Sequence, residues 1–232
     1  IKRRTLDGRV QEDIRPQPGS GVPSGVPLAG EGLHPINPDT CAVLPIVFGF
    51  VGPGSHLAEA TLAQVEQLWN QSWSGGGYGR YHVDSEPDSP GPWPFASVFV
   101  ARAAIEEGRS EPFWRVLRWM DTVPGAAAGS WFEFYGPRPS PPCPQVGVIP
   151  WTWAELVLLF VSHVLGVRPE ADQVRIRPRL PAGLDRIEAR LPVGSGWIHL
   201  QVKADASAPY REVLLDPSDR TETVELVVPP LP

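Results

Sequence analysis

The stretch that decides the fold is residues 151–176, WTWAELVLLFVSHVLGVRPEADQVRI. Its first part is apolar nearly all round and holds no glycine or proline, which predicts a buried helix from Trp151 to Leu165. Gly166 follows as a helix stop. Beyond it, Val174 and Ile176 alternate with polar residues at the period of a strand. The sequence therefore predicts helices before residue 166 and strands after it.

Upstream of residue 151, apolar side chains recur at spacings of three and four residues, as they do on one face of a helix. The pattern predicts helices over residues 57–69, 95–105 and 113–120. Cap and stop residues stand beside them: Ser55 before the first helix, Gly108 after the second, and Ser110 before the third. Because so few residues separate the last two helices, we expect them to form an αα-hairpin.

Composition divides the chain into three parts. Residues 1–38 are rich in proline and glycine, which predicts an extended lead-in without regular structure. Residues 39–166 hold the helices, the first of them a short apolar helix that runs to Phe50 and that Pro45 kinks if it falls beyond the first turn. Residues 167–232 hold short alternating strands. The predicted fold class is mainly α, followed by a small antiparallel β module.

Bulk composition excludes several classes of protein. The chain of 232 residues is 42% hydrophobic, which is enough to bury a core, and its net charge of −6 argues against binding to nucleic acid. No apolar run is long enough to predict a membrane span. The two cysteines are far apart, which predicts neither a disulfide framework nor a zinc site and fits a reducing, cytoplasmic location. The start at Ile1, without a secretory signal, indicates a fragment or a processed piece.

Tryptophan is concentrated in one part of the chain. Eight of the nine tryptophans lie between Trp69 and Trp153, and most of them fall in or beside predicted loops. Indole rings stack on the apolar faces of sugars, so aromatic loops above a helical scaffold suit a carbohydrate site. The alternative is that these rings fill an irregular core, which is the usual role of a large aromatic side chain.

One aromatic loop also carries many polar side chains. Residues 75–94 read GGGYGRYHVDSEPDSPGPWP and bring together Tyr78, Arg80, Tyr81, His82, Asp84, Glu86, Asp88 and Trp93. Carboxylates beside an arginine and a histidine can bind sugar hydroxyls or polarise a leaving group, whereas a solvated acidic loop is the plainer interpretation. The twelve-residue calcium-loop pattern is absent, so no metal site is predicted.

A second aromatic segment surrounds a single carboxylate. Residues 129–136 read GSWFEFYG, and Glu133 is their only acid. If the neighbouring rings shield Glu133 from water, its pKa rises towards a value useful for acid or base catalysis. If the side chain is exposed and points away from them, it is inert.

Three motifs resemble the six-hairpin, or (α/α)6, glycosidases, particularly their glucoamylase-like, α-rhamnosidase-like and glycogen-debranching-like members. The motifs are GGYGRYHVDSEP followed by GPWPFASVFVARA, then WFEFYG, and then PQVGVIPWTWAELVLLFVSHVLGVRP running into VRIRPRLP. The resemblance covers about residues 37–203. It implies the helical part of a toroid over residues 39–166, and an inverting enzyme that uses two carboxylates and no cofactor or metal.

The resemblance also implies roles for individual residues. Glu133 would be the general base that activates water. The sugar-binding residues would be Tyr78, Arg80, Tyr81, His82, Asp84, Glu86, Trp93, Trp131, Tyr135 and Trp151. The general acid lies earlier in such barrels, so we expect it upstream of Ile1, together with the missing half of the toroid on the same or a second chain. The predicted function is the C-terminal portion of a glycoside hydrolase that is incomplete alone.

Two other functions stay open. A sugar phosphorylase of the same fold would use phosphate in place of water, although the sequence shows no basic or glycine-rich phosphate cradle beyond Arg80. A non-catalytic carbohydrate-binding or assembly subunit would use the aromatic loop for affinity alone. The sequence does not specify the sugar or the linkage.

Overall fold

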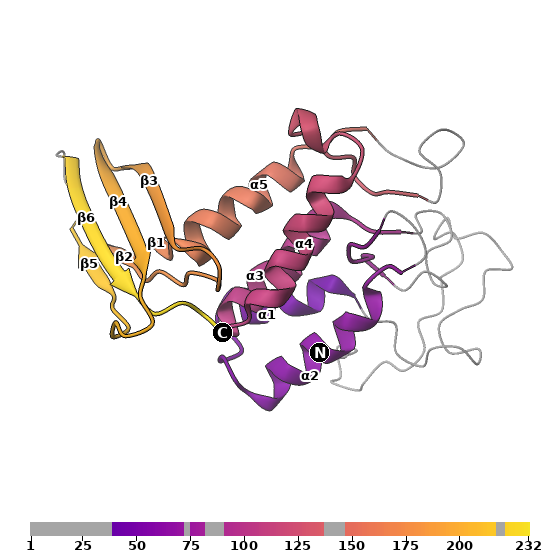
Figure 1. Cartoon of the computed structure of the whole chain (residues 1–232), viewed down its shortest axis with the longest axis horizontal. Helices are drawn as coiled ribbons and strands as arrows, with labels where there is room; N and C mark the ends of the chain where they lie inside the picture. Colours follow the sequence, from indigo (N-terminus) through magenta and orange to yellow (C-terminus); the bar gives the residue numbers. More distant parts are fainter. Residues whose placement is uncertain (1–38, 72–74, 82–90, 137–146, 217–220) are drawn as a thin grey trace, which may run out of the picture. The chain divides into compact units, whose positions relative to one another are not determined.

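The computed structural model of this chain describes residues 39–71, 75–81, 91–136, 147–216 and 221–232 (Figure 1). The lead-in predicted over residues 1–38 lies outside these ranges. The chain forms two compact units. Unit 1 consists of Ile1–Ala103 and Val116–Thr152, and unit 2 of Ala104–Arg115 and Trp153–Pro232.

Five α-helices occur among the described residues. They are α1 (Leu44–Val47), α2 (His56–Val65), α3 (Pro94–Glu106), α4 (Ser110–Thr122) and α5 (Trp151–Leu158). Shorter 3-10 turns lie at η1 (Thr40–Val43), η2 (Glu66–Leu68) and η4 (Ala126–Ala128). The Oγ of Ser55 accepts a hydrogen bond from the Ala58 amide at 3.2 Å, as its position before α2 predicted.

The first predicted helix is divided in two. The carboxylate of Asp39 accepts a hydrogen bond from the Cys41 amide at 2.8 Å, and the turn that it caps is a 3-10 helix. Pro45 lies in the first turn of the α-helix that follows. Amides in a first turn have no partner within the helix, so proline, which has no amide hydrogen, costs no hydrogen bond there. The chain therefore has no kinked helix here but two consecutive short ones, and the prediction of a single helix to Phe50 was wrong.

Ser110 does not act as a simple helix cap. It is the first residue of α4, and its amide donates to the carbonyl of Pro232 at 3.0 Å. Its Oγ accepts from the Ala182 amide at 2.8 Å. The polar groups at the start of α4 are therefore satisfied by two segments of unit 2 that are distant in sequence.

The helix predicted from Trp151 to Leu165 changes its winding halfway. It is α-helical as far as Leu158 and continues as the π-helix η5 (Leu159–Val164), in which the Leu165 amide donates to the Phe160 carbonyl five residues earlier. Gly166 ends it at a φ of 66°, as predicted.

The same helix is less buried than its apolar sequence predicted. The side chains of Trp151, Trp153 and Val157 are 50%, 40% and 61% exposed. The prediction of a fully buried helix was therefore wrong, because no described part of the chain covers this side of α5.

Unit 2 holds two three-stranded sheets (Figure 1). The first has the order β1 (Val167–Pro169), β2 (Val174–Ile176) and β5 (Val213–Leu215), and all its pairs are antiparallel. The second has the order β3 (Arg186–Val193), β4 (Gly196–Ala204) and β6 (Thr221–Val228). A β module follows the helices, as expected.

The prediction of a purely antiparallel module was wrong in one pair. β3 and β4 form an antiparallel hairpin, but β6 runs parallel to β4, with Leu200 opposite Val224. The chain leaves this sheet after β4, contributes β5 to the other sheet, and returns in the original direction. Such a crossover connection is what a parallel pair requires.

The alternation of side chains explains how the second sheet is stabilised. On β4, Ile198, Leu200 and Val202 are buried, His199 and Gln201 between them are half-buried, and Trp197 and Lys203 on either side are exposed. The exposed face carries cross-strand pairs, among them Glu188 with His199 at 2.7 Å. One face of the sheet therefore forms the core of unit 2 and the other faces water.

Candidate functional site

In unit 1, a glycine-rich segment makes room for aromatic rings. Gly77 has a φ of 82°, and a Cβ atom at this position would lie 2.5 Å from the ring of Trp119 and 2.6 Å from Pro92. Gly76 is similarly close to the ring of Trp69. Only glycine allows the backbone to pass between these rings, so Gly76 and Gly77 have a packing role.

Three segments that are distant in sequence meet beside Pro92. Gly79 pairs with Pro92 in an antiparallel bridge. The Tyr135 amide donates to the Pro92 carbonyl at 2.9 Å, and the Trp93 amide donates to the Tyr78 carbonyl at 2.8 Å. The structure thus brings together the loop of residues 76–81, the segment before α3, and the segment that carries Glu133.

Arg80 lies against two of the predicted sugar-binding rings. Its guanidinium carbon is 4.9 Å from the ring centre of Tyr81 and 5.7 Å from that of Trp93. Arg80 and Tyr81 are half-buried. The Nε atom of Arg80 is shielded from water and has no hydrogen-bond partner in the described structure. Such cation–π contacts fix the direction of a guanidinium without neutralising its charge.

Trp93 is the centre of an aromatic cluster in unit 1. Its ring stacks on Phe134 with the centroids 5.0 Å apart and meets the edge of Phe95 at 5.5 Å. Phe95 in turn contacts Trp151 at 5.4 Å. Trp93 is nearly buried, whereas Trp151, at the start of α5, is half exposed. The cluster therefore links the buried base of the site to an exposed ring.

Glu133 lies between two anchored residues. On one side, Phe132 forms a bridge with Val148, and its amide donates to the hydroxyl of Tyr135 at 3.3 Å. On the other side, Phe134 stacks on Trp93. Glu133 itself is half-buried and makes no hydrogen bond or ion pair with the described residues. Its backbone is thus held in place, while its carboxylate accepts no hydrogen bond from the part of the chain that the structure describes.

Two predicted sugar-binding tyrosines are buried in unit 1. Tyr78 is 0% exposed, and its hydroxyl donates to Glu66 at 2.8 Å. Tyr135 is 1% exposed, and its hydroxyl donates to the Pro124 carbonyl at 2.7 Å. Burial raises the pKa of Tyr135, and the hydrogen bond from Phe132 offsets only part of this effect. Both rings lie inside the unit and hold the loops in place.

The other predicted residues fall into two groups. Trp131 is half-buried, and its indole N–H donates to the Met120 carbonyl at 3.0 Å, which ties the segment before Glu133 to α4. His82, Asp84 and Glu86 lie outside the described residues.

Within the described ranges, no three His, Cys, Asp or Glu side chains are grouped so that they could hold a metal ion. None of the described helices has the length and apolar character needed to cross a membrane.

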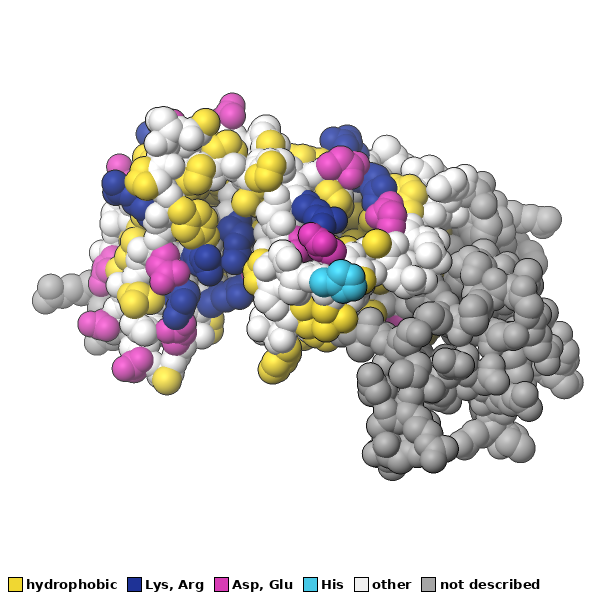
Figure 2. Space-filling view, turned by 90° about the horizontal axis from the view of Figure 1, so that it is seen from below, with side chains coloured by type: hydrophobic (Ala, Val, Ile, Leu, Met, Phe, Trp, Pro, Cys, Tyr) yellow, Lys and Arg dark blue, Asp and Glu magenta, His cyan; other side chains and the backbone are white. Residues whose placement is uncertain are grey.

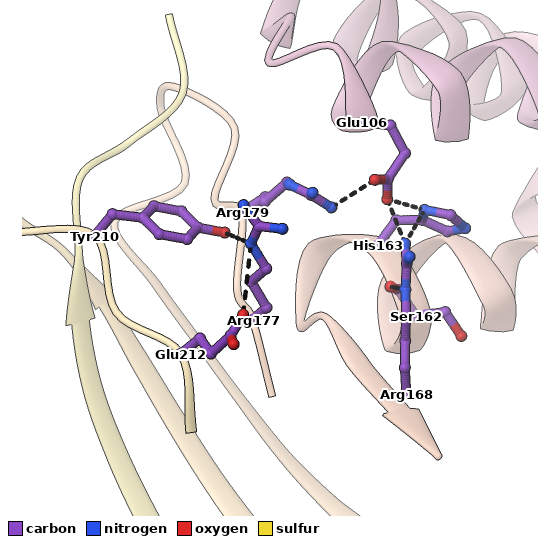
Figure 3. A network of polar contacts seen from close by, with 8 residues as sticks. All are labelled: Glu106, Ser162, His163, Arg168, Arg177, Arg179, Tyr210 and Glu212. Atoms are coloured by element: carbon purple, nitrogen blue, oxygen red, sulfur yellow. Dashed lines mark hydrogen bonds and ion pairs between the residues drawn. The ribbon is translucent and has the colours of Figure 1, made fainter. Parts of the chain in front are cut away.

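Unit 2 contains a buried polar network that the sequence analysis did not identify (Figure 3). We call it the Glu106 cluster; it consists of Glu106, His163, Arg168 and Arg179. His163 Nδ1 and Arg168 Nη2 both contact Oε1 of Glu106, the former at 2.6 Å, and Arg179 Nη1 contacts Oε2 at 2.8 Å. The side chains of Glu106 and His163 are 7% and 2% exposed.

The charge state of Glu106 follows from these contacts. Burial by itself raises the pKa of the carboxyl, but the hydrogen bond with His163 and the charges of Arg179 and Arg168 together outweigh it. The pKa of Glu106 is therefore lowered, and the carboxylate is ionised at neutral pH. One signal was present in the sequence, since Glu106 ends a mostly apolar helix and arginine recurs in VRIRPRL.

Figure 3 also shows a neighbouring surface contact in unit 2. Arg177 Nε donates to the hydroxyl of Tyr210 at 3.0 Å and lies 3.9 Å from Glu212. All three side chains are exposed, so water screens this group and its contribution to stability is small.

Comparison with known proteins gives no evidence about the function of this site. No family model matches the chain, and no curated protein matches it in sequence. Any assignment of function therefore depends on the residues described above.

Proposed function

We propose that this chain is part of an inverting glycoside hydrolase and that the segments around Pro92 form its sugar-binding surface. One observation carries the proposal: three aromatic segments far apart in sequence converge on Trp93. They place Arg80 against the ring of Trp93 and the backbone of Glu133 beside it. Aromatic rings that surround a few fixed polar groups are typical of sites that bind sugars.

In this proposal Glu133 is the general base. A carboxylate with open acceptor sites takes a proton from water as the water attacks the anomeric carbon, while an acid on the opposite face of the sugar protonates the leaving oxygen. Arg80 donates hydrogen bonds to sugar hydroxyls, and the exposed ring of Trp151 gives a stacking surface. The general acid comes from residues outside this sequence, and neither metal nor cofactor takes part.

We propose further that the helices belong to an (α/α)6 toroid. α3 and α4 follow one another with a short turn between them, as the two helices of such a hairpin do. The exposed apolar side chains of α5, Trp153, Val157 and Leu158, would pack against further helices of the toroid. Hydrophobic side chains are also visible among charged ones on the face drawn in Figure 2. The remaining hairpins, on the same or a second chain, would be the partner.

The test uses the longest polypeptide that contains this chain. We expect it to hydrolyse oligosaccharides with inversion, observed as the anomer first formed in a proton NMR time course. Glu133→Gln should reduce kcat at least about 100-fold, because a general base contributes about 10²–10⁴-fold. Glu59→Gln, at an exposed position of α2, serves as the control and should leave kcat unchanged.

Product analysis separates the alternatives. If a sugar phosphate formed only when phosphate was present, the protein would be a phosphorylase and the hydrolase proposal would be wrong. If oligosaccharides bound without cleavage by the complete polypeptide, the binding-subunit interpretation would replace it. If Glu133→Gln retained full turnover, Glu133 would have no part in the mechanism.

A further inference from the structure

Unit 2 carries a row of arginines that begins on β2 and continues past its end. Buried side chains alternate with them along the chain, so that Val174, Ile176 and Pro178 are buried and Arg175, Arg177 and Arg179 follow each in turn. This alternation places the three guanidinium groups on one side of the segment. Arg179 contacts the buried Glu106 at 2.8 Å, whereas Arg175 and Arg177 are 38% and 45% exposed.

Arg177 is held in a fixed position although its side chain is exposed. Its amide donates to the Gly166 carbonyl at 3.0 Å, and a Cβ atom on Gly166 would overlap the Arg177 carbonyl, so the two backbones lie in direct contact. Its Nε donates to the hydroxyl of Tyr210 at 3.0 Å (Figure 3). Its guanidinium carbon lies 5.2 Å from the centre of the same ring. Both ends of the side chain are therefore oriented.

The terminal nitrogens of Arg177 are not used by these contacts. The nearest carboxylate, that of Glu212, lies 3.9 Å from Nε, which is beyond hydrogen-bond distance. Within the part of the chain that the structure describes, Nη1 and Nη2 of Arg177 have no hydrogen-bond partner. These two nitrogens form the fork with which an arginine binds two oxygens of a carboxylate or a phosphate.

The neighbouring carboxylate neutralises this arginine only loosely. Glu212 lies 3.7 Å from Nη1 of Arg175 and 3.9 Å from Nε of Arg177, so it forms a hydrogen bond with neither. The short contact of Arg175, at 2.6 Å, is with Glu170. One carboxylate is thus shared between two guanidinium groups.

The charges of this part of unit 2 do not balance within the described residues. Three carboxylates are in contact with four guanidinium groups, those of Arg168, Arg175, Arg177 and Arg179. The set therefore has an excess of positive charge, although the whole chain has a net charge of −6. An anion with two negative charges would complement the two exposed arginines better than Glu212 does.

Stability does not account for the order of Arg177. Ion pairs and hydrogen bonds between exposed side chains stabilise a fold little, and fixing a long side chain costs conformational entropy. A guanidinium that is already oriented, however, loses less entropy when it binds a ligand. The arrangement is therefore typical of recognition.

We propose that Arg175 and Arg177 form a binding site for a phosphate group, either free phosphate or the phosphate of a monoester. The fork of Arg177 holds two of its oxygens, Arg175 supplies the second positive charge, and Glu212 competes with the ligand. A phosphate monoester carries a charge of about −1.5 to −2 at neutral pH, which matches two guanidinium groups, whereas a carboxylate carries one charge. The site lies wholly within unit 2 and is independent of the proposed glycosidase activity.

The experiment observes the arginines directly, in the full chain with nitrogen-15 in its arginine side chains. Single Arg→Lys variants assign the Nε–H signals, and inorganic phosphate is added at constant ionic strength. The signals of Arg175 and Arg177 should shift and reach saturation. Arg190 is the internal control, because it also lies over an exposed ring, that of Trp197 at 4.5 Å. If the Arg177 signal shifted no further than that of Arg190, the proposal would be overturned.

Three variants test the role of each group. Arg177→Lys keeps the charge but loses the fork and should weaken phosphate binding by about tenfold. Glu212→Gln removes the competing carboxylate and should strengthen binding by about threefold. Arg190→Lys should leave the affinity unchanged. If Arg177→Lys bound phosphate as tightly as the unchanged protein, the ions would be attracted by charge alone and there would be no site.

The choice of ligand identifies the source of the phosphate. Tighter binding of glucose 6-phosphate than of inorganic phosphate would indicate a monoester, and the reverse order would indicate the free ion. Acetate should bind at least about tenfold more weakly than either, because it carries one charge. Equal affinities for acetate and phosphate would contradict the assignment. Neither result depends on whether Glu133→Gln lowers turnover, so the two proposals can fail separately.

Discussion

The Nδ1 atom of His163 lies 2.6 Å from Oε1 of Glu106, in a part of unit 2 that is almost completely shielded from water. This pair joins the end of α3 to the π-helix that follows α5. Because a buried carboxylate is stabilised here by a histidine and two arginines, the stability of the protein should depend on pH in a defined way.

The first prediction concerns that pH dependence. The pKa of Glu106 is lowered from 4.5 in the folded protein, so its ionised form stabilises the fold at every pH above the value in the unfolded chain. The stabilisation is lost as the pH falls through the lowered pKa. At pH 7, Glu106→Gln should lower the free energy of unfolding by about 3 kcal/mol. Urea unfolding should show that this difference shrinks below pH 4.5. An equal difference at pH 7 and pH 3 would contradict the assignment.

The second prediction concerns Gly166, at the end of η5. Its φ is 66°, and a Cβ atom there would overlap the Arg177 carbonyl, so Gly166→Ala combines backbone strain with a clash. We expect it to lower the free energy of unfolding by about 3 kcal/mol or to prevent folding. Gly183→Ala is the control, because Gly183 has a φ of 86° with nothing within 4 Å. That variant should cost only about 1 kcal/mol, from backbone strain alone.

The third prediction separates affinity from stability at Arg80. Arg80→Ala removes a cation–π contact with Trp93, which costs about 0.5–1 kcal/mol of folding stability. Arg190→Ala removes a similar contact with Trp197, at 4.5 Å, on the exposed face of the second sheet. Calorimetric unfolding should therefore show comparable small losses for both. Only Arg80→Ala should weaken oligosaccharide binding to the complete polypeptide, by about tenfold or more; equal affinities would remove Arg80 from the site.

The fourth prediction concerns the loop that presents Glu133. Tyr135→Phe removes the hydroxyl that contacts the Phe132 amide and the Pro124 carbonyl, and should lower the free energy of unfolding by about 1–2 kcal/mol. Hydrogen exchange at the Phe132 amide should become faster. Tyr78→Phe loses a hydroxyl bonded to Glu66 and should reduce stability without changing exchange at Phe132. Identical exchange at Phe132 in both variants would show that Tyr135 does not hold this loop.

The local features of the fold could be predicted because they depend on a few adjacent residues. Ser55 caps α2 through an amide three residues away, and Gly166 ends its helix because it adopts a positive φ. The alternation of Ile198, Leu200 and Val202 likewise shows which face of β4 is buried. Each of these signals lies within one turn or one strand.

The features that could not be predicted depend on partners far away in sequence. The direction of β6 depends on the crossover through β5. The alternation of buried and exposed side chains along β6 is the same for a parallel and an antiparallel strand, so it does not show this direction. The π-helical winding of η5 could not be predicted either, because the apolar sequence around it fits an α-helix equally well. At the candidate site, the sequence marked Tyr78 and Tyr135 as aromatic but did not show that they are buried.

The position of β5 along the chain has a consequence for dividing this protein by genetic truncation. β5 belongs to one sheet, but in the chain it stands between β4 and β6, which pair in the other. No single cut between β1 and β6 leaves both sheets with all their strands, since every such cut deprives one sheet or both of a partner. Expression of the β part should therefore succeed or fail as a whole, and circular permutation rather than truncation is the way to dissect it.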